Sequence, residues 1–380
     1  LDYNSWVDPS ETILQDILED ERLAHTRLIS EPWTASGTGP GIGGFPMSSD
    51  GTQGWAEWNA HFRDWWRSFL NDDAFVLSDT EGIDGGTTLT GSQSVYGHNG
   101  RHPFHSVNFV TAHDGFTLYD LFSYEDKQNG CGLLNPVCCD DPMSVWCDDE
   151  SGEEHNRSRN WGDEALKRQM MRNMFVALFV SHGTPMILGG DEWMRTQFGN
   201  NNAYSSSSDN EWNWFRWGEW RSTYATHRSR MHDFVRGMIQ VRQAYGHALT
   251  PSTYGGGMPL SWKSPQNTDM AASDWSGKSV AAHYYADGDF SDEPEVLILI
   301  NMERDTVDFT LPTGREWSQI VDTQSWYDLP GPGESGGGWF SDNPTEDPYL
   351  SANIRLENPA PIGDSSYSVQ GSSIVILVTQ

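Results

Sequence analysis

The sequence predicts an α/β protein, with part of a (β/α) barrel followed by an antiparallel β-domain. Over residues 1–249, short apolar runs alternate with amphipathic helical patterns. Carboxylates follow several of these runs, as expected where parallel strands end at the rim of a barrel. Over residues 250–380, short β-rich runs lie between turns rich in Gly, Pro, Asp and Ser, which is typical of an antiparallel domain.

The first helix–strand step is expected near the start of the chain. Asp8, Pro9 and Glu11 form a helix start signal, in which Asp is the cap and Pro occupies the first turn. Apolar residues at positions 13, 14, 17 and 18 then share one helix face. A brief strand follows at residues 28–29 and closes beside Glu31.

Further elements follow in the same alternating order. Residues 54–59 predict a short strand, and the next helix runs through Phe62 and Phe69. Residues 163–181 predict a long helix, and residues 185–188 a strand that ends before Asp191. Another amphipathic helix is expected at residues 231–245. The β-rich runs of the second part are residues 280–285, 296–300, 307–311, 317–321 and 374–378.

The functional prediction depends on residues 107–120. Their apolar start is typical of a buried strand, and the strand stops at a turn where His113 and Asp114 are adjacent. In a barrel, Glu31 and Asp114 would point into one cavity at the rim. Two carboxylates that flank a bond, one of them held protonated, are what glycoside hydrolysis requires. The alternative is that Asp114 only caps the next helix.

The composition and net charge of the chain disfavour some classes of binding partner. The formal net charge of −31 disfavours nucleic acid and anionic membrane surfaces as partners. This charge suits either a salt-adapted protein or an acidic secreted one. A hydrophobic content of 36% excludes a disordered chain, and no run approaches the roughly 20 apolar residues of a membrane span. The 18 Trp residues suit either sugar stacking or core packing.

All the cysteines lie in one polar segment, and their spacing is not that of a zinc site. An even number of cysteines in a polar loop favours two local disulfides, an oxidising compartment and therefore an extracellular protein. Four free thiols are the alternative. The chain opens on Leu1 without a signal peptide, so we expect a cut start. The four residues are Cys131, Cys138, Cys139 and Cys147.

Several motifs resemble the isoamylases and glycogen-debranching enzymes of the α-amylase superfamily. LISEPW at residues 28–33 is similar to the general-acid region of that superfamily, and FVTAHDG at residues 109–115 to its His-Asp region. Residues 250–380 more loosely resemble the C-terminal domain of secreted bacterial isoamylases. The motifs that resemble isoamylases more narrowly are GGFP (43–46), GWAEWNAHFRDWWR (54–67), VNFVTAHDGFTLYDL (107–121), HNRSRNWG (155–162) and GTPMILGGDEWMRTQFGNNNAY (183–204).

This resemblance implies retaining hydrolysis of the α-1,6 branch linkages of glycogen and amylopectin. It makes Glu31 the general acid/base and Asp114 the carboxylate that binds sugar hydroxyls and stabilises the transition state. It implies no required cofactor and no metal in the catalytic site, and leaves a structural calcium ion open. Arg195 suits a structural role equally well. The substrate-binding residues that the resemblance implies are His113, Trp33, Glu57 and Arg195.

The sequence departs from the family pattern at the nucleophile. The family carries an Asp in a segment that reads roughly G-F-R-F-D before the acid, and Asp2 lacks the Arg of that pattern. The chain therefore resembles the C-terminal half of a longer enzyme, with the second half of a (β/α)8 barrel at 1–249 and a β-domain at 250–380. Half a barrel leaves open sheet edges. We therefore expect the N-terminal portion of the same enzyme, as a second chain or segment, to complete it.

Two alternatives stay open at this point. One is a different specificity within the superfamily, such as pullulanase action or α-1,4 cleavage. The other is a glucan-binding subunit without catalytic activity.

Overall fold

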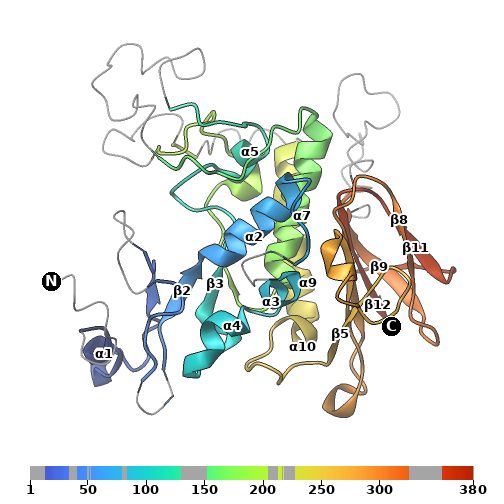
Figure 1. Ribbon diagram of the computed structural model, residues 1–380, viewed down its shortest axis with the longest axis horizontal. Coiled ribbons are helices and arrows are strands. Elements are labelled where there is room, and N and C mark those ends of the chain that lie inside the picture. Colours follow the sequence, from blue (N-terminus) through green and yellow to red (C-terminus); the bar gives the residue numbers. More distant parts are fainter. Residues whose placement is uncertain are drawn as a thin grey trace.

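Long helices lie between a parallel sheet and an antiparallel sheet (Figure 1). This computed structural model describes residues 13–33, 41–48, 51, 53–78, 84–129, 152–203, 213–215, 217, 227–324 and 353–379. The predicted cap at Asp8 and the four cysteines (Cys131, Cys138, Cys139 and Cys147) lie outside the described residues.

The parallel sheet has four strands in the order β1-β2-β3-β4, and each neighbouring pair is parallel. The strands predicted near residues 28, 56 and 107 are confirmed, whereas the fourth is shorter than predicted. All four strands run the same way, so their carboxyl ends lie at one edge of the sheet. The strands are β1 (Ile29–Ser30), β2 (Ala56–Asn59), β3 (Ser106–Asn108) and β4 (Thr184–Pro185).

Helices follow the strands, as the sequence predicts. The α-helices are α1 (Ile13–Leu18), α2 (Ala60–Asn71), α3 (Gly85–Leu89), α4 (Gln93–Tyr96), α5 (Leu118–Leu121), α7 (Glu164–Val180), α9 (His227–Ala244) and α10 (Gly246–Leu249). The 3-10 helices are η3 (Glu21–Leu23), η4 (Gly97–Asn99), η5 (Pro103–His105), η7 (Asp191–Trp193), η8 (Asp274–Ser276) and η9 (Gly288–Phe290).

Helix α2 begins directly at the end of β2. Asn59, the last residue of that strand, caps the helix by accepting a hydrogen bond from the backbone N–H of Phe62 at 3.0 Å. The helix then buries one aromatic face, which includes Phe62, Trp65 and Phe69. Because strand and helix share Asn59, the start of α2 lies at the carboxyl edge of the parallel sheet.

Helix α7 is buried on all sides from Lys167 to Val180. Asp163 caps it by accepting hydrogen bonds from the backbone of Ala165 and Leu166. Its polar side chains reach the second part of the chain: Asn173 Nδ2 donates to the carbonyl oxygen of Ser372 at 2.7 Å. The antiparallel sheet thus covers the face of α7 that a helix on a single sheet would expose.

The antiparallel sheet has the order β10-β9-β12-β7-β6-β5, and β8 pairs with β11 in a separate two-stranded sheet. All five predicted β-rich runs are strands, and β5, β10 and β11 are strands that the sequence analysis missed. The strands are β5 (Leu260–Lys263), β6 (Ser279–Tyr284), β7 (Val296–Asn301), β8 (Val307–Thr310), β9 (Trp317–Asp322), β10 (Ala360–Pro361), β11 (Ser366–Val369) and β12 (Ser373–Thr379).

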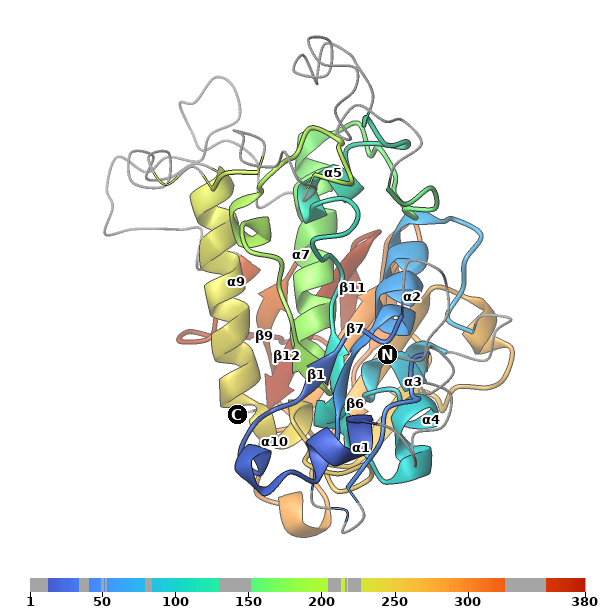
Figure 2. The ribbon, with the colours of Figure 1, turned by 90° about the vertical axis from the view of Figure 1, so that its left-hand side faces the viewer.

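One hydrophobic core joins the two parts. It runs from the aromatic face of α2 through α7 and α9 to the strands β6, β7 and β12. In Figures 1 and 2, α7 and α9 stand against the antiparallel sheet. The change from parallel to antiparallel architecture falls between α10 and β5. The division at residue 250 into two domains stays a prediction.

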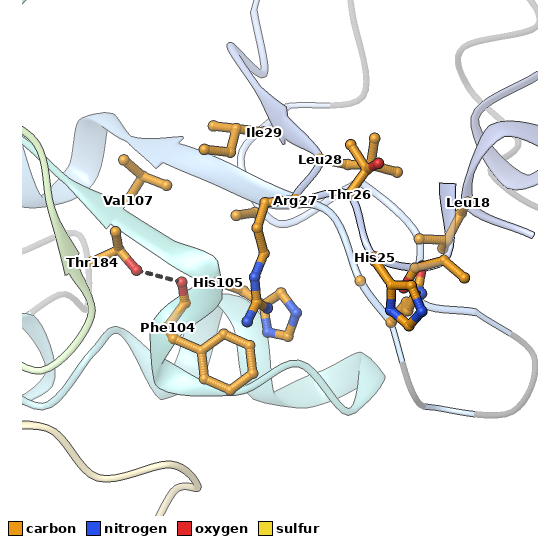
Figure 3. Close-up of a pocket in the computed structure, with 14 residues that line it drawn as sticks. Leu18, His25, Thr26, Arg27, Leu28, Ile29, Phe104, His105, Val107 and Thr184 are labelled. Atoms are coloured by element: carbon orange, nitrogen blue, oxygen red, sulfur yellow. Dashed lines mark hydrogen bonds between the residues drawn. The ribbon is translucent and has the colours of Figure 1, made fainter. Parts of the chain in front are cut away.

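A groove of about 700 Å³ lies along the parallel sheet (Figure 3). Ile29, Ala56 and Val107, from three neighbouring strands, line it together with Phe104 and Arg27. Ile29 is 51% exposed there. Part of this sheet is therefore apolar and open to solvent. No helix in the described part of the chain has both the length and the apolarity to cross a membrane.

Candidate active site

Three predicted site residues come together at the carboxyl edge of the parallel sheet. Glu31 follows β1, and His113 and Asp114 follow β3 in the turn beyond it. One nitrogen or oxygen atom from each side chain lies within 4.8 Å of the others. His113 Nε2 is 3.7 Å from Asp114 Oδ1, and both side chains are exposed by more than 40%. The cluster is thus open to a ligand.

Aromatic rings lie beside this cluster. The Trp33 ring stacks on Phe109 with 6.3 Å between centroids, and Trp58 meets the edges of Trp33 and His113 at 6.3 and 5.9 Å. Phe109 is fully buried and lies under the Arg63 guanidinium at 5.5 Å. The partly exposed indoles of Trp33 and Trp58, inclined at 61° to each other, give the cluster an aromatic wall. Such faces stack on apolar C–H surfaces.

Glu57 lies outside the cluster, although it too is on a strand of the parallel sheet. Its side chain is fully buried and ion-paired with the buried guanidinium of Arg101. Its carboxylate also accepts hydrogen bonds from the backbone of Gly43 at 2.6 Å and Phe45 at 3.0 Å. The prediction of a substrate contact at Glu57 is therefore wrong for this structure. β2 turns Glu57 away from Trp58, because successive side chains of a strand face opposite ways.

Arg195 is half-buried on the loop after η7, where its side chain packs against Gly190. Gly190 has φ +103°, and a Cβ there would come within 2.8 Å of Arg195 Cδ. Glycine is therefore required for this close approach. The predicted substrate contact of Arg195 stays a prediction.

The loop with three consecutive Asn residues has a structural role at its centre. Asn201 is buried and exchanges two hydrogen bonds with Asn129, while its Nδ2 donates to Asn156 Oδ1 at 2.9 Å. Its carbonyl oxygen accepts from the Gly115 backbone at 2.9 Å. This loop therefore supports the turn that carries His113.

The sequence analysis missed the contribution of Trp58 and Phe109 to the wall. Both lie on predicted strands, although Phe109 falls one residue past the end of β3, and the pattern along those predicted strands was the available signal. Which face of the sheet they occupy depends on strand register, which a single sequence does not fix.

The cluster offers few of the oxygen ligands that a calcium ion takes. Glu31, His113 and Asp114 are the one His/Cys/Asp/Glu group spaced for a metal among the residues that the structure describes. Calcium takes six to eight oxygen ligands. Two carboxylates and an imidazole are also the groups that hydrogen-bond neutral polar ligands such as sugar hydroxyls.

No protein-family model matches the chain. Several curated proteins are similar to the chain. An isoamylase from Flavobacterium sp. is 35% identical over 313 residues, which cover 80% of this chain and 38% of that protein. A glycogen operon protein GlgX homolog from Mycobacterium bovis is 31% identical over 339 residues, covering 81% of this chain and 43% of that protein. The chain belongs to the isoamylase–GlgX family.

This membership confirms the resemblance that the motifs indicated. The chloroplastic isoamylase SU1 of Zea mays is also similar, with 33% identity over 82% of this isoamylase-family chain and 36% of the maize protein. The chain therefore spans well under half the length of these relatives. A pullulanase structure from Bacillus acidopullulyticus matches 96% of the chain and 36% of its own, with a TM-score of 0.57 and 18% identity. That likeness shows the fold alone.

Proposed function

We propose that this chain is the part of an α-glucan debranching hydrolase that carries the general acid/base, Glu31. The observation that carries the proposal is the convergence of Glu31, His113 and Asp114 within 4.8 Å beside the wall of Trp33 and Trp58. An aromatic face for a sugar ring and carboxylates for its hydroxyls and glycosidic oxygen are what glycoside hydrolysis needs. Membership in the isoamylase–GlgX family supports an α-1,6 branch linkage as the bond cleaved.

The reaction proceeds in two steps with net retention of configuration. In the first, a nucleophilic Asp outside this chain attacks the anomeric carbon, and Glu31 donates a proton to the departing 6-oxygen. In the second, Glu31 takes a proton from water, whose oxygen attacks the same carbon and releases the Asp. The carboxylate of Asp114 stabilises the positive charge that develops on the sugar, and His113 binds the same ring.

The nucleophile comes from a second segment that completes a (β/α)8 barrel, of which residues 1–249 are the second half. The open apolar groove at Ile29 and Val107 supports this proposal, since a barrel interior is filled with side chains. The chain also spans only 36–43% of the relatives named above. The segment is the N-terminal portion of the same enzyme.

We also retain extracellular location as a proposal. It rests on the two disulfides proposed for Cys131, Cys138, Cys139 and Cys147. Titration of free thiols in the unfolded, unreduced protein tests it, since four reactive thiols would contradict both proposals.

The function is tested by product analysis. A longer polypeptide that contains this chain and the nucleophile-bearing segment is incubated with amylopectin and separately with pullulan. Debranching of the isoamylase type releases linear chains from amylopectin, with the α-anomer formed first, and leaves pullulan largely intact. Glu31→Gln should lower the rate by about 10²–10⁴-fold, the usual contribution of a general acid. Near-normal debranching by Glu31→Gln would refute its role, and cleavage of pullulan alone would refute the specificity.

A further inference from the structure

A buried carboxylate joins the two ends of the loop that carries His113 and Asp114. Asp191, the first residue of η7, is 1% exposed. Its Oδ2 accepts a hydrogen bond from Thr111 Oγ1, and its Oδ1 accepts one from the backbone N–H of Leu118 at 3.0 Å. Residues 111–118 are here called the His-Asp loop. Its first and last residues are thus both hydrogen-bonded to the Asp191 side chain.

Two further hydrogen bonds each hold the His-Asp loop or its start at one point. Arg67 Nε donates to the carbonyl oxygen of Val110 at 2.8 Å, just before the loop. The Gly115 N–H donates to the carbonyl oxygen of Asn201 at 2.9 Å. Neither contact sets the distance between the two ends. Asp191 sets that distance, because its two carboxylate oxygens are a fixed distance apart.

Burial raises the pKa of the Asp191 carboxyl to about 6, and the hydrogen bonds from Thr111 and Leu118 oppose that rise. Arg67 and Arg195 exert attraction on the carboxylate, and Glu192 exerts repulsion. Arg67 is itself buried, and its Nη1 donates to the Asn156 carbonyl oxygen at 3.3 Å. The Asp191 carboxylate is therefore buried and hydrogen-bonded, unlike the exposed carboxylates of the cluster.

We propose that Asp191 is a positioning residue, which holds His113 and Asp114 in register with Glu31 across the carboxyl edge of the sheet. The inference rests on the proposed function, since register matters only where these groups act on one sugar ring. A group displaced by about 1 Å can cost about 10²-fold in rate. Loss of Asp191 leaves the N–H of Leu118 buried without this acceptor, which favours a rearranged loop.

Asparagine offers a conservative test, because its shape retains both hydrogen bonds. Its Oδ1 can accept from Leu118, and its Nδ2 can donate to the hydroxyl of Thr111, which is both donor and acceptor. Alanine removes both contacts, and Thr111→Val removes one. Asp322→Ala is the control for simple destabilisation. Asp322 is also buried, but it lies in β9 and accepts from Tyr367 at 3.0 Å.

The experiment measures two properties of the four variants and the unaltered protein. The first is amide hydrogen exchange in residues 107–121. The second is kcat and KM for release of chains from amylopectin, measured in a polypeptide that contains this chain and the nucleophile-bearing segment. We expect faster exchange in Asp191→Ala, intermediate exchange in Thr111→Val, and near-normal exchange in Asp191→Asn. We expect kcat to fall about 10²-fold in Asp191→Ala with a smaller change in KM, and to be largely restored in Asp191→Asn.

Two results would overturn the inference. One is normal exchange in both Asp191→Ala and Thr111→Val. The other is a loss of kcat in Asp191→Ala no larger than that in Asp322→Ala at equal loss of stability. Should Asp191→Ala fail to fold, Thr111→Val and Asp191→Asn decide between the outcomes. A polypeptide that contains this chain and the nucleophile-bearing segment, and yet releases no chains, would count against the proposed function alone, because the exchange data still test the role of Asp191.

Discussion

The carboxyl groups of Glu31 and Asp114 approach each other within 4.8 Å, although the strands that they follow, β1 and β3, are not neighbours. β2 lies between these strands, and strands two apart in a sheet are separated by about 10 Å. Both side chains must therefore lean over the end of β2. The aromatic ring there is Trp58, which contacts His113 and Trp33 on either side.

Because Asp114 lies beside Glu31 in the cluster, we expect Asp114→Asn to stabilise the transition state less well. The substitution preserves shape and removes the negative charge beside the sugar. We expect kcat for amylopectin to fall about 10²–10³-fold, the effect typical of removing one preorganised electrostatic group. Asp269→Asn, at an exposed carboxylate in the antiparallel part, is the control and should leave kcat unchanged. Equal kcat in the two variants would contradict the role of Asp114.

The aromatic wall predicts weaker binding of linear maltooligosaccharides by Trp33→Ala. Loss of one stacking face should raise Kd about three- to tenfold, and Trp33→Phe should recover part of the loss. Isothermal titration calorimetry measures both. Trp275→Ala is the matched control, because Trp275 packs on Trp262 in the antiparallel part. Unchanged Kd in Trp33→Ala would show that sugars do not use the wall.

The burial of Glu57 predicts an effect on stability. Glu57→Gln leaves the Arg101 guanidinium buried without its counter-ion, which typically costs about 3–5 kcal/mol. Urea unfolding measures the free energy of unfolding. The control pair is Lys263 and Asp269, which is largely exposed, so Asp269→Asn should cost less than about 1 kcal/mol. A stable Glu57→Gln with raised KM would instead restore Glu57 as a substrate contact.

Asp120 predicts a pH dependence of stability. Burial raises the pKa of this carboxyl to about 6, despite its hydrogen bonds from Thr196 and Gln197. The unfolded carboxyl titrates near its ordinary value of about 3.9. Between these values the folded state binds more protons, so the contribution of Asp120 to the free energy of unfolding falls as pH rises from about 4 to about 6.

Asp120→Asn should therefore stabilise the protein more at pH 7 than at pH 4.5, relative to the unaltered protein. The difference between the two pH values should be about 2 kcal/mol, most of the free-energy equivalent of the shift in pKa. Asn keeps both hydrogen bonds by donating to Thr196 and accepting from Gln197. Urea unfolding at the two pH values measures the difference. If the difference in free energy of unfolding between the variant and the unaltered protein were the same at both pH values, the raised pKa of Asp120 would be contradicted.

Local pattern was sufficient for most of the elements. The alternation of apolar residues placed β1, β2, β3, α2, α7 and α9, and Asn59 and Asp163 stand at the caps where polar residues are expected. Strand β5 was missed because all its residues are only half-buried, so its sequence lacks the apolar run of a buried strand.

The sequence by itself determined which residue types end the parallel strands, and so identified Glu31, His113 and Asp114 as one candidate site. That inference rests on strand direction, because the carboxyl ends of parallel strands lie at a common edge. Only the tertiary structure decided that Glu57 is a buried ion-pair partner, that Trp58 joins the aromatic wall, and that Asp191 spans the His-Asp loop. These roles depend on which distant segment packs against each side chain, and a local pattern does not contain that information.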